Sequence, residues 1–119
     1  MDNRNLQFES LARMIESKST QQALDWSASN YANAYQTPLG TGIIMISYSE
    51  DNGYYGSDPI PIYSLAFINE FGVTFHTIDA YLSTDPEYEM LKEIYDSAYD
   101  SYMKTDETYK SMVRDIMSK

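Results

Sequence analysis

The middle of the chain constrains the fold most, because three short apolar segments there are separated by turn-forming residues. Gly42–Ser49 is rich in β-branched side chains and predicts a strand. Ile62–Ile68 predicts a second strand, although an amphipathic helix over Ile60–Glu70 also fits the pattern. Val73–Ile78 predicts a third strand, and Gly72 allows the turn before it through its access to positive φ. We therefore expect a three-stranded antiparallel meander in this region.

Helical patterns come before the meander. Residues 5–17 place their apolar side chains on one side of a short helix, as an amphipathic helix requires. Ser19 precedes Gln22 by three residues, which is a capping-box pattern, and predicts a second helix that continues to about Gln36. The Pro38-Leu39-Gly40 segment ends this helix.

A long helix is predicted after the meander. Thr84–Glu87 has the capping-box pattern with proline in the first turn. A seam of residues at heptad spacing follows, which indicates one face of a helix. Its members are Tyr88, Leu91, Tyr95, Ala98, Tyr102, Tyr109 and Met112. A restart of the helix with a kink at Thr105–Glu107 is the alternative.

These elements predict an α+β fold and a single domain over residues 1–119, a length typical of one domain. The expected architecture has N-terminal helices, a three-stranded antiparallel meander and a long C-terminal helix packed on one face.

The charge distribution excludes some binding partners. The chain has a net charge of −10, with 18 acidic and eight basic residues, and no Lys or Arg lies between Lys18 and Lys92. Nucleic acids and anionic membranes are bound mainly through Lys and Arg, so we expect no direct nucleic-acid binding and no membrane binding. No apolar run reaches the roughly 18 residues needed to span a bilayer. The N-terminal residues lack the apolar stretch of a signal peptide.

The sequence offers little catalytic chemistry. It has no cysteine, and His76 is its only histidine, in a predicted strand where a structural role is the more common one. The acidic loop after Glu50 does not match the calcium-loop spacing, and no G-x-S-x-G or phosphate-binding glycine loop occurs. We predict no enzymatic activity, no catalytic residues, no cofactor and no metal site. A small hydrolase that uses carboxylates is a minor alternative.

Four acidic residues recur on one face of the predicted C-terminal helix at spacings of four, three and four residues. We name them the acidic ridge: Glu89, Glu93, Asp96 and Asp100. The ridge is either a solvated helix face or a surface that lines a channel or imitates the phosphates of DNA.

Two short motifs resemble those of the tail-completion proteins of tailed bacteriophages, also called neck, head–tail joining or minor tail proteins. Pro38-Leu39-Gly40-Thr41-Gly42 matches the P-x-x-T-G segment that leads into the family's first strand. "YSLAFINEFG" is similar to the segment that closes its second strand, with Val73 where the family commonly has threonine. The matching positions are Pro38, Thr41, Gly42, Tyr63, Glu70, Phe71 and Gly72.

The resemblance implies a helix, a three-stranded meander and a helix, in a subunit that forms a ring between the head connector and the tail tube. On this basis Phe71 would anchor the strand end in the core, Gly72 would make the turn and Glu70 would face a neighbouring subunit. We also expect the long loop that carries Tyr54 and Tyr55 to project and contact a neighbour.

The sequence therefore predicts a non-enzymatic virion structural protein that forms a homo-oligomeric ring with an acidic DNA conduit. Its partners would be copies of itself and the neighbouring connector and tail-tube proteins. Its place would be the phage neck or tail, after assembly in the host cytoplasm. The alternative is a small acidic DNA mimic that inhibits a nuclease or a host-defence protein.

Overall fold

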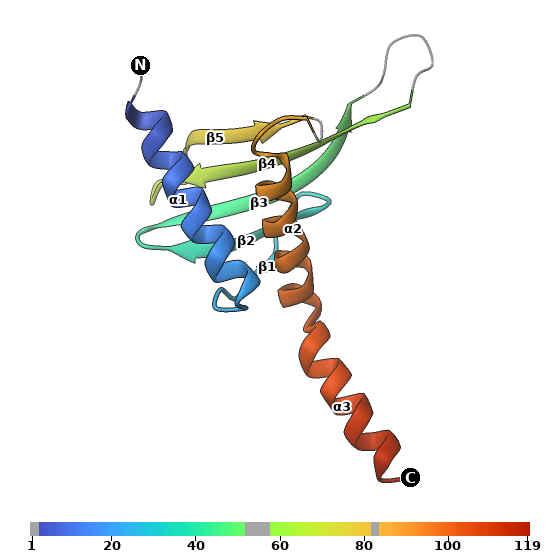
Figure 1. Ribbon diagram of the computed structural model, residues 1–119. Coiled ribbons are helices and arrows are strands. Elements are labelled where there is room, and N and C mark those ends of the chain that lie inside the picture. The colour runs from blue at the N-terminus through green and yellow to red at the C-terminus, as the bar shows by residue number, and fades with distance from the viewer. Residues whose placement is uncertain (1–2, 52–57, 82–83) are drawn as a thin grey trace.

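The computed structural model describes residues 3–51, 58–81 and 84–119, with side chains from Leu6 onward. These residues form five strands and three helices (Figure 1). In chain order they are α1 (Asn3–Thr20), β1 (Ser27–Ala28), β2 (Ala34–Leu39), β3 (Gly42–Asp51), β4 (Ile60–Ile68), β5 (Thr74–Ala80), α2 (Tyr88–Met103) and α3 (Thr105–Met117).

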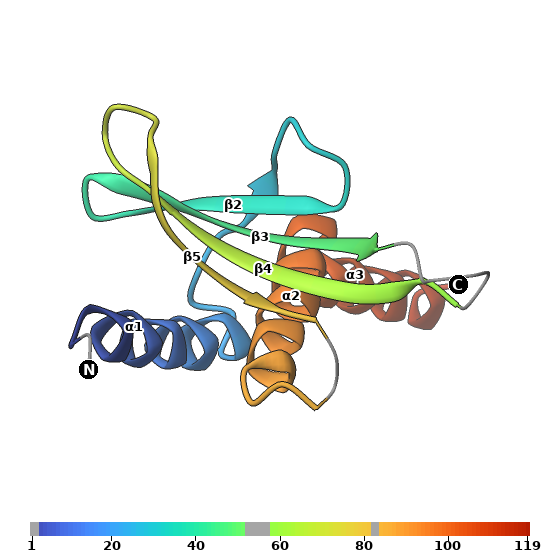
Figure 2. The ribbon, with the colours of Figure 1, turned by 90° about the horizontal axis from the view of Figure 1, so that it is seen from above.

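The strands form one antiparallel sheet in the order β1-β2-β3-β4-β5, so each strand pairs with its neighbours in sequence. Helices α1 and α2 lie on the same face of this sheet, which gives a two-layer arrangement (Figures 1 and 2). Ile44 pairs with Phe67 and Ile46 pairs with Leu65, and all of these side chains are buried beneath the helices.

The core lies between the sheet and the two helices. Ile46 and Leu65 on the sheet and Leu91 and Ile94 on α2 are fully buried. Burying one side chain of this size contributes about 1.5–3 kcal/mol, so this layer holds α2 firmly on the sheet. Phe8 and Leu11 of α1 pack against the same cluster.

The prediction of a three-stranded meander after two helices is wrong. The three predicted strands coincide with β3, β4 and β5, and Ile60–Glu70 contains a strand rather than a helix, but two more strands precede them. Ser19 does not cap a helix: it is a buried residue near the end of α1. Gln22 and Asn33 have φ values of +58° and +54°, which no continuous helix allows. The segment forms β1 and β2 because pairing with β3 overrides its helical propensity.

The prediction of one long C-terminal helix is also wrong, and the alternative of a restart at Thr105–Glu107 is confirmed, since α3 begins at Thr105. Lys104 adopts the left-handed conformation, with φ 54° and ψ 42°, and separates α2 from α3. The Thr84–Glu87 segment is not a capping box, because α2 begins at Tyr88 and has no side-chain cap. Instead Asp85 Oδ2 accepts a hydrogen bond from the Tyr81 N–H at 2.7 Å. Figure 1 shows α3 projecting away from the sheet.

Ser101 connects α2 to the segment that leads into β1. Its Oγ accepts a hydrogen bond from the Trp26 N–H at 3.1 Å and donates one to the Leu24 carbonyl oxygen at 3.2 Å. We expect Ser101→Ala to lower the free energy of unfolding by about 1–2 kcal/mol, because both backbone groups lose their partner. Denaturant unfolding followed by the fluorescence of Trp26, the only tryptophan, measures this.

Ser111→Ala is the matched control for this prediction, since Ser111 is exposed on α3. It should change the free energy of unfolding by less than about 0.5 kcal/mol. Equal effects of the two substitutions would contradict the assigned role of Ser101.

Candidate interaction surfaces

The two motif segments meet at one end of the sheet, although they begin 25 positions apart in the sequence, at Pro38 and Tyr63. Leu39 pairs with Gly42 across the β2–β3 turn, and the next residue of β3, Ile43, pairs with Ile68 at the end of β4. A Cβ added to Gly42 would lie 2.3 Å from the Ile68 carbonyl oxygen, so this close approach requires glycine. We name this region the turn end: Pro38, Thr41, Gly42, Glu70, Phe71 and Gly72.

Asn69, which the sequence reasoning missed, holds the turn between β4 and β5. Its Oδ1 accepts hydrogen bonds from the N–H groups of Phe71 and Val73 at 2.9 and 3.1 Å. Gly72 has a φ of +79°, which confirms its predicted role in the turn. An asparagine whose side chain accepts a hydrogen bond from the backbone two residues later is a common turn signal, so the role of Asn69 could have been recognised.

The prediction that Phe71 anchors the strand end in the core is wrong. Its side chain is 81% exposed, because the Asn69 turn directs it into solvent. Val73 and Phe75 are also more than half exposed. The turn end and the adjoining start of β5 therefore present a group of apolar side chains at the surface, with Glu70 exposed beside them.

A shallow groove adjoins the turn end on the helix side of the sheet. It has a volume of about 250 Å³ and lies between α1 and the two turns. Phe8, Leu39, Phe67 and Phe75 contribute to its mainly apolar lining. The ring centroids of Phe8 and Phe75 are 5.8 Å apart. An apolar groove beside exposed apolar side chains suits contact with another protein better than binding of a charged ligand.

Tyr63 does not lie at the turn end, although the motif includes it. It is buried in the N-terminal half of β4, and its ring centroid is 5.2 Å from those of Tyr48 and Tyr88 and 5.5 Å from that of Tyr95. Burial raises the pKa of Tyr63 above its ordinary value. Tyr63 is thus part of an aromatic cluster that packs α2 on the sheet. Tyr54 and Tyr55 lie outside the described residues.

Tyr48, in the same cluster, makes the stability of the fold depend on pH in a way that can be measured. Its hydroxyl donates a hydrogen bond to Glu50 Oε1 at 2.8 Å, and this bond is the main cause that raises the pKa of Tyr48 to about 12. The pKa of tyrosine in the unfolded chain is about 10. The stability that the Tyr48–Glu50 hydrogen bond contributes is therefore present below pH 10 and is lost as the pH rises toward 12. Glu50→Gln should shift one tyrosine to lower pH in an ultraviolet titration of tyrosinate.

Glu93→Gln is the control for this titration, since Glu93 is exposed on α2. It should leave the titration of Tyr48 unchanged. If the tyrosine titration curve were the same with and without Glu50→Gln, the Glu50 carboxylate would not be what raises the pKa of Tyr48.

The acidic ridge lies on the exposed side of α2, away from the buried residues Leu91, Ile94 and Ala98. All four carboxylates are exposed. Lys92 Nζ lies 2.8 Å from Asp96 Oδ2, and this contact raises the pKa of Lys92. The ridge thus keeps most of its negative charge facing solvent, and its proposed place on a channel wall stays a prediction.

Helix α3 has an apolar stripe without a partner in the described chain. Tyr109, Met112 and Ile116 are 66%, 65% and 68% exposed, and none of residues 105–117, all of them described, is buried. We name these three residues the α3 stripe. They continue the seam that Leu91 and Ala98 form on α2, where both side chains are completely buried against the sheet.

The sheet face opposite the helices is also partly apolar. Ile43 pairs with Ile68 and Met45 pairs with Ala66, and these residues alternate along β3 and β4 with the buried ones. We name these four residues the open face. Their side chains are half-buried and do not belong to the core cluster. A sheet face in contact with water is normally polar, so the continuous apolar run Gly42–Ile46 was a missed signal of this second apolar face.

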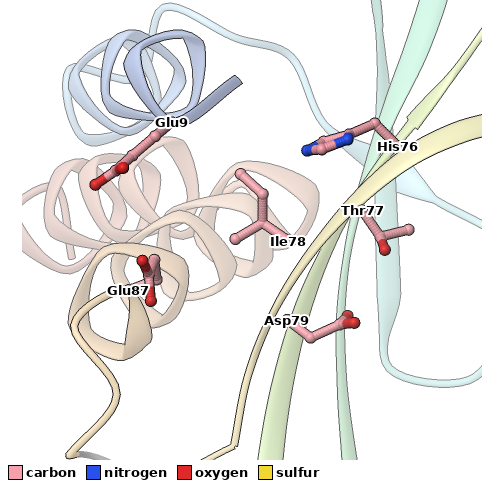
Figure 3. Close-up of a pocket in the computed structure, with 6 residues that line it drawn as sticks. All are labelled: Glu9, His76, Thr77, Ile78, Asp79 and Glu87. Atoms are coloured by element: carbon pink, nitrogen blue, oxygen red, sulfur yellow. The ribbon is translucent and has the colours of Figure 1, made fainter. Parts of the chain in front are cut away.

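A pocket of about 270 Å³ surrounds His76, and its lining residues are Glu9, His76, Thr77, Ile78, Asp79 and Glu87 (Figure 3). The His76 ring stacks on Phe8, with centroids 4.1 Å apart. Figure 3 shows Asp79 pointing away from Glu9 and Glu87, and Asp79 accepts a hydrogen bond from Ser64. No acidic side chain in the described residues hydrogen-bonds His76, which therefore packs rather than forms an acid–base pair.

Comparisons with protein-family models, with curated proteins and with solved structures find no match for this chain. The resemblance to tail-completion proteins therefore stays a prediction from the two motifs. Within residues 3–51, 58–81 and 84–119, no group of three or more His, Cys, Asp or Glu residues is placed to hold a metal ion. No helix in the same part of the chain has both the length and the apolar character to cross a membrane.

Proposed function

We propose that this chain is a non-enzymatic virion structural protein of a tailed bacteriophage. It acts as a head–tail joining or tail-completion subunit that assembles with copies of itself into a ring around an acidic DNA conduit. The observation that supports this best is the meeting of the two motif segments at the turn end, where Gly42 permits a close backbone contact and Phe71 is exposed.

The exposed apolar surfaces support self-association. Phe71 at the turn end, Val73 and Phe75 beside it, and the α3 stripe are all more than half exposed. Contiguous apolar patches on a soluble chain mark protein–protein contacts, because burying them against a partner removes them from water. The turn end and α3 lie at different ends of the subunit, an arrangement that allows head-to-tail contacts and closure into a ring (Figure 1).

The charge distribution suits a conduit through which DNA passes without being bound. A subunit with a net charge of −10 and an exposed acidic ridge repels the phosphate backbone. Carboxylates that face the lumen would keep the sliding DNA off the wall. The connector and the tail-tube proteins would then contact the two rims of the ring.

Sedimentation of the purified chain between 0.1 and 1 M NaCl tests this function. The Debye length falls from about 10 Å to about 3 Å over this range, which weakens repulsion between acidic subunits. We expect a defined oligomer that persists or strengthens as the salt concentration rises. The double variant Glu93→Gln with Asp100→Asn should assemble at a lower salt concentration than the parent chain. The double variant Asp25→Asn with Asp58→Asn makes the same change in net charge outside the ridge, and it should lower the required salt concentration less.

A DNA mimic would behave in the opposite way. It would sediment as a monomer at every salt concentration, bind a basic nuclease at low salt and release it at high salt. That result would contradict the ring and favour the inhibitor.

A further inference from the structure

We propose that Lys104 is a hinge at which α3 changes its direction relative to α2 and the sheet. This inference goes beyond the proposed function, because the hinge is a property of the single subunit. The sheet with α1 and α2 forms one fixed body, whereas the direction in which the α3 stripe points is adjustable.

Helix α2 is fixed to the body of the subunit almost as far as Lys104. Leu91, Ile94 and Ala98 are completely buried against the sheet. Near the end of the helix, Ser101 bonds the backbone of the segment before β1, and the ring centroid of Tyr102 lies 5.4 Å from that of Tyr35. These contacts hold α2 in place up to two residues before the break.

Helix α3 has no comparable attachment. None of residues Thr105–Met117, all of them described, is buried. Within the described chain, α2 is the only element with which α3 makes more than isolated contacts. The side-chain hydrogen bond across the break, from Thr105 Oγ1 to Asp100 Oδ1, is 3.5 Å long and exposed. Turning α3 about Lys104 therefore takes no side chain out of the core.

The backbone of Lys104 sets the direction of α3. Its φ of 54° and ψ of 42° place it in the left-handed region, which is unfavourable for lysine because its Cβ crowds the following carbonyl oxygen. The right-handed conformation is the ordinary one for lysine, and adopting it opens the bend. Hinges consist of a few residues at the ends of elements that absorb such a change in φ and ψ.

The space beside the break is open. A cleft of about 370 Å³ lies between the segment Gln22–Asp25 and the junction of α2 with α3. Asp106 and Glu107, in the first turn of α3, line this cleft together with Lys104. Figures 1 and 2 show the rest of α3 extending beyond the sheet. The first turn of α3 thus lies against a cleft rather than against packed side chains.

Distances between two spin labels test the hinge, and the chain has no cysteine of its own to interfere. Glu93→Cys and Ser111→Cys place labels at exposed positions on α2 and α3. Mixing the labelled chain with an excess of unlabelled parent chain restricts the measurement to distances within one subunit. We expect a shorter distance from the bent arrangement and a longer one from the open arrangement. Labels at Lys18→Cys and Glu93→Cys, both in the fixed body, should give a single narrow distance.

Substitutions at the hinge should change the two populations in opposite directions. In Lys104→Ile the β-branched side chain disfavours the left-handed conformation, so the fraction with the shorter distance should fall at least about fivefold. In Lys104→Gly the left-handed conformation has no steric cost, so this fraction should rise. Lys110→Ile makes the same change within α3, away from the break, and should leave the parent distribution unchanged.

The outcomes separate the hinge from the proposed function. A single distance that is the same in the parent chain, Lys104→Gly and Lys104→Ile would show a fixed bend and overturn the hinge, whether or not rings form. Equal effects of Lys104→Ile and Lys110→Ile, or a loss of helical circular dichroism in Lys104→Ile, would show that α3 unfolds rather than turns, and would also overturn it. A chain that forms no ring but shows the two populations would overturn the proposed function alone.

Discussion

Replacing Tyr109, Met112 and Ile116 together by alanine is expected to abolish assembly and leave the subunit folded. No residue of α3 is buried within the subunit, so these substitutions do not open a cavity in the core. Alanine also preserves the helical propensity of α3. Each side chain contributes about 1.5–3 kcal/mol when it is buried against a partner, so the loss is roughly 4.5–9 kcal/mol per contact. A loss of this size raises the dissociation constant by more than about a thousandfold.

Sedimentation velocity and thermal unfolding together measure this effect. The triple variant should sediment as a monomer and unfold at the temperature of the unassembled parent chain. Glu107→Ala with Lys110→Ala changes the opposite side of α3 without changing net charge, and it should assemble like the parent chain. A triple variant that assembles normally would show that the α3 stripe is not a subunit contact.

The second large effect is expected for Gly42→Ala. The added Cβ would lie 2.3 Å from the Ile68 carbonyl oxygen, a backbone atom that moves only if the β3–β4 pairing shifts. We expect the free energy of unfolding to fall by about 3 kcal/mol, the upper range for overpacking in a tight site. Denaturant unfolding, monitored by Trp26 fluorescence, gives this value.

Gly40→Ala provides the comparison, since Gly40 lies two residues earlier in the same turn. Its φ of +61° makes alanine unfavourable by about 1–2 kcal/mol, but no atom lies within 4 Å of the added Cβ. If Gly40→Ala destabilised the chain as much as Gly42→Ala, backbone conformation alone would explain both effects, and the close contact would not be the reason for glycine at position 42.

The sequence was informative where local patterns and tertiary pairing agree. The β-branched segment at Gly42–Ser49 and the two segments after it form β3, β4 and β5, as their composition indicates. The prediction failed at Ser19–Gln36, where the capping-box pattern and the alanines indicated a helix. There Tyr35 and Thr37 pair with Ile46 and Ile44, and this non-local pairing outweighs the local preference.

The heptad seam of the C-terminal region and a possible restart of the helix at Thr105–Glu107 were recognisable, but the loss of burial beyond that point was not. Lys104 in the left-handed conformation breaks the helix without glycine, asparagine or proline to mark it. The register of the seam continues across this break, so sequence periodicity alone cannot separate α2 from α3. What differs is burial, which depends on where the sheet ends.

The candidate surfaces were predicted in part. Gly42 and Gly72 occupy positions that require glycine, for close contact and for positive φ respectively. Phe71 was expected in the core on the basis of the resemblance to tail-completion proteins, yet the Asn69 turn exposes it. The open face could be located only once the pairing register of β3 and β4 was known, since a shift of one residue exchanges the two faces.

Electron cryomicroscopy of the assembled chain tests the central claim most directly, because it shows symmetry, lumen and contacts together. We predict closed rings in which the acidic ridge faces the central opening. Monomers, or closed two-fold dimers with the ridge on the outer surface, would contradict the claim that this chain forms a conduit for DNA.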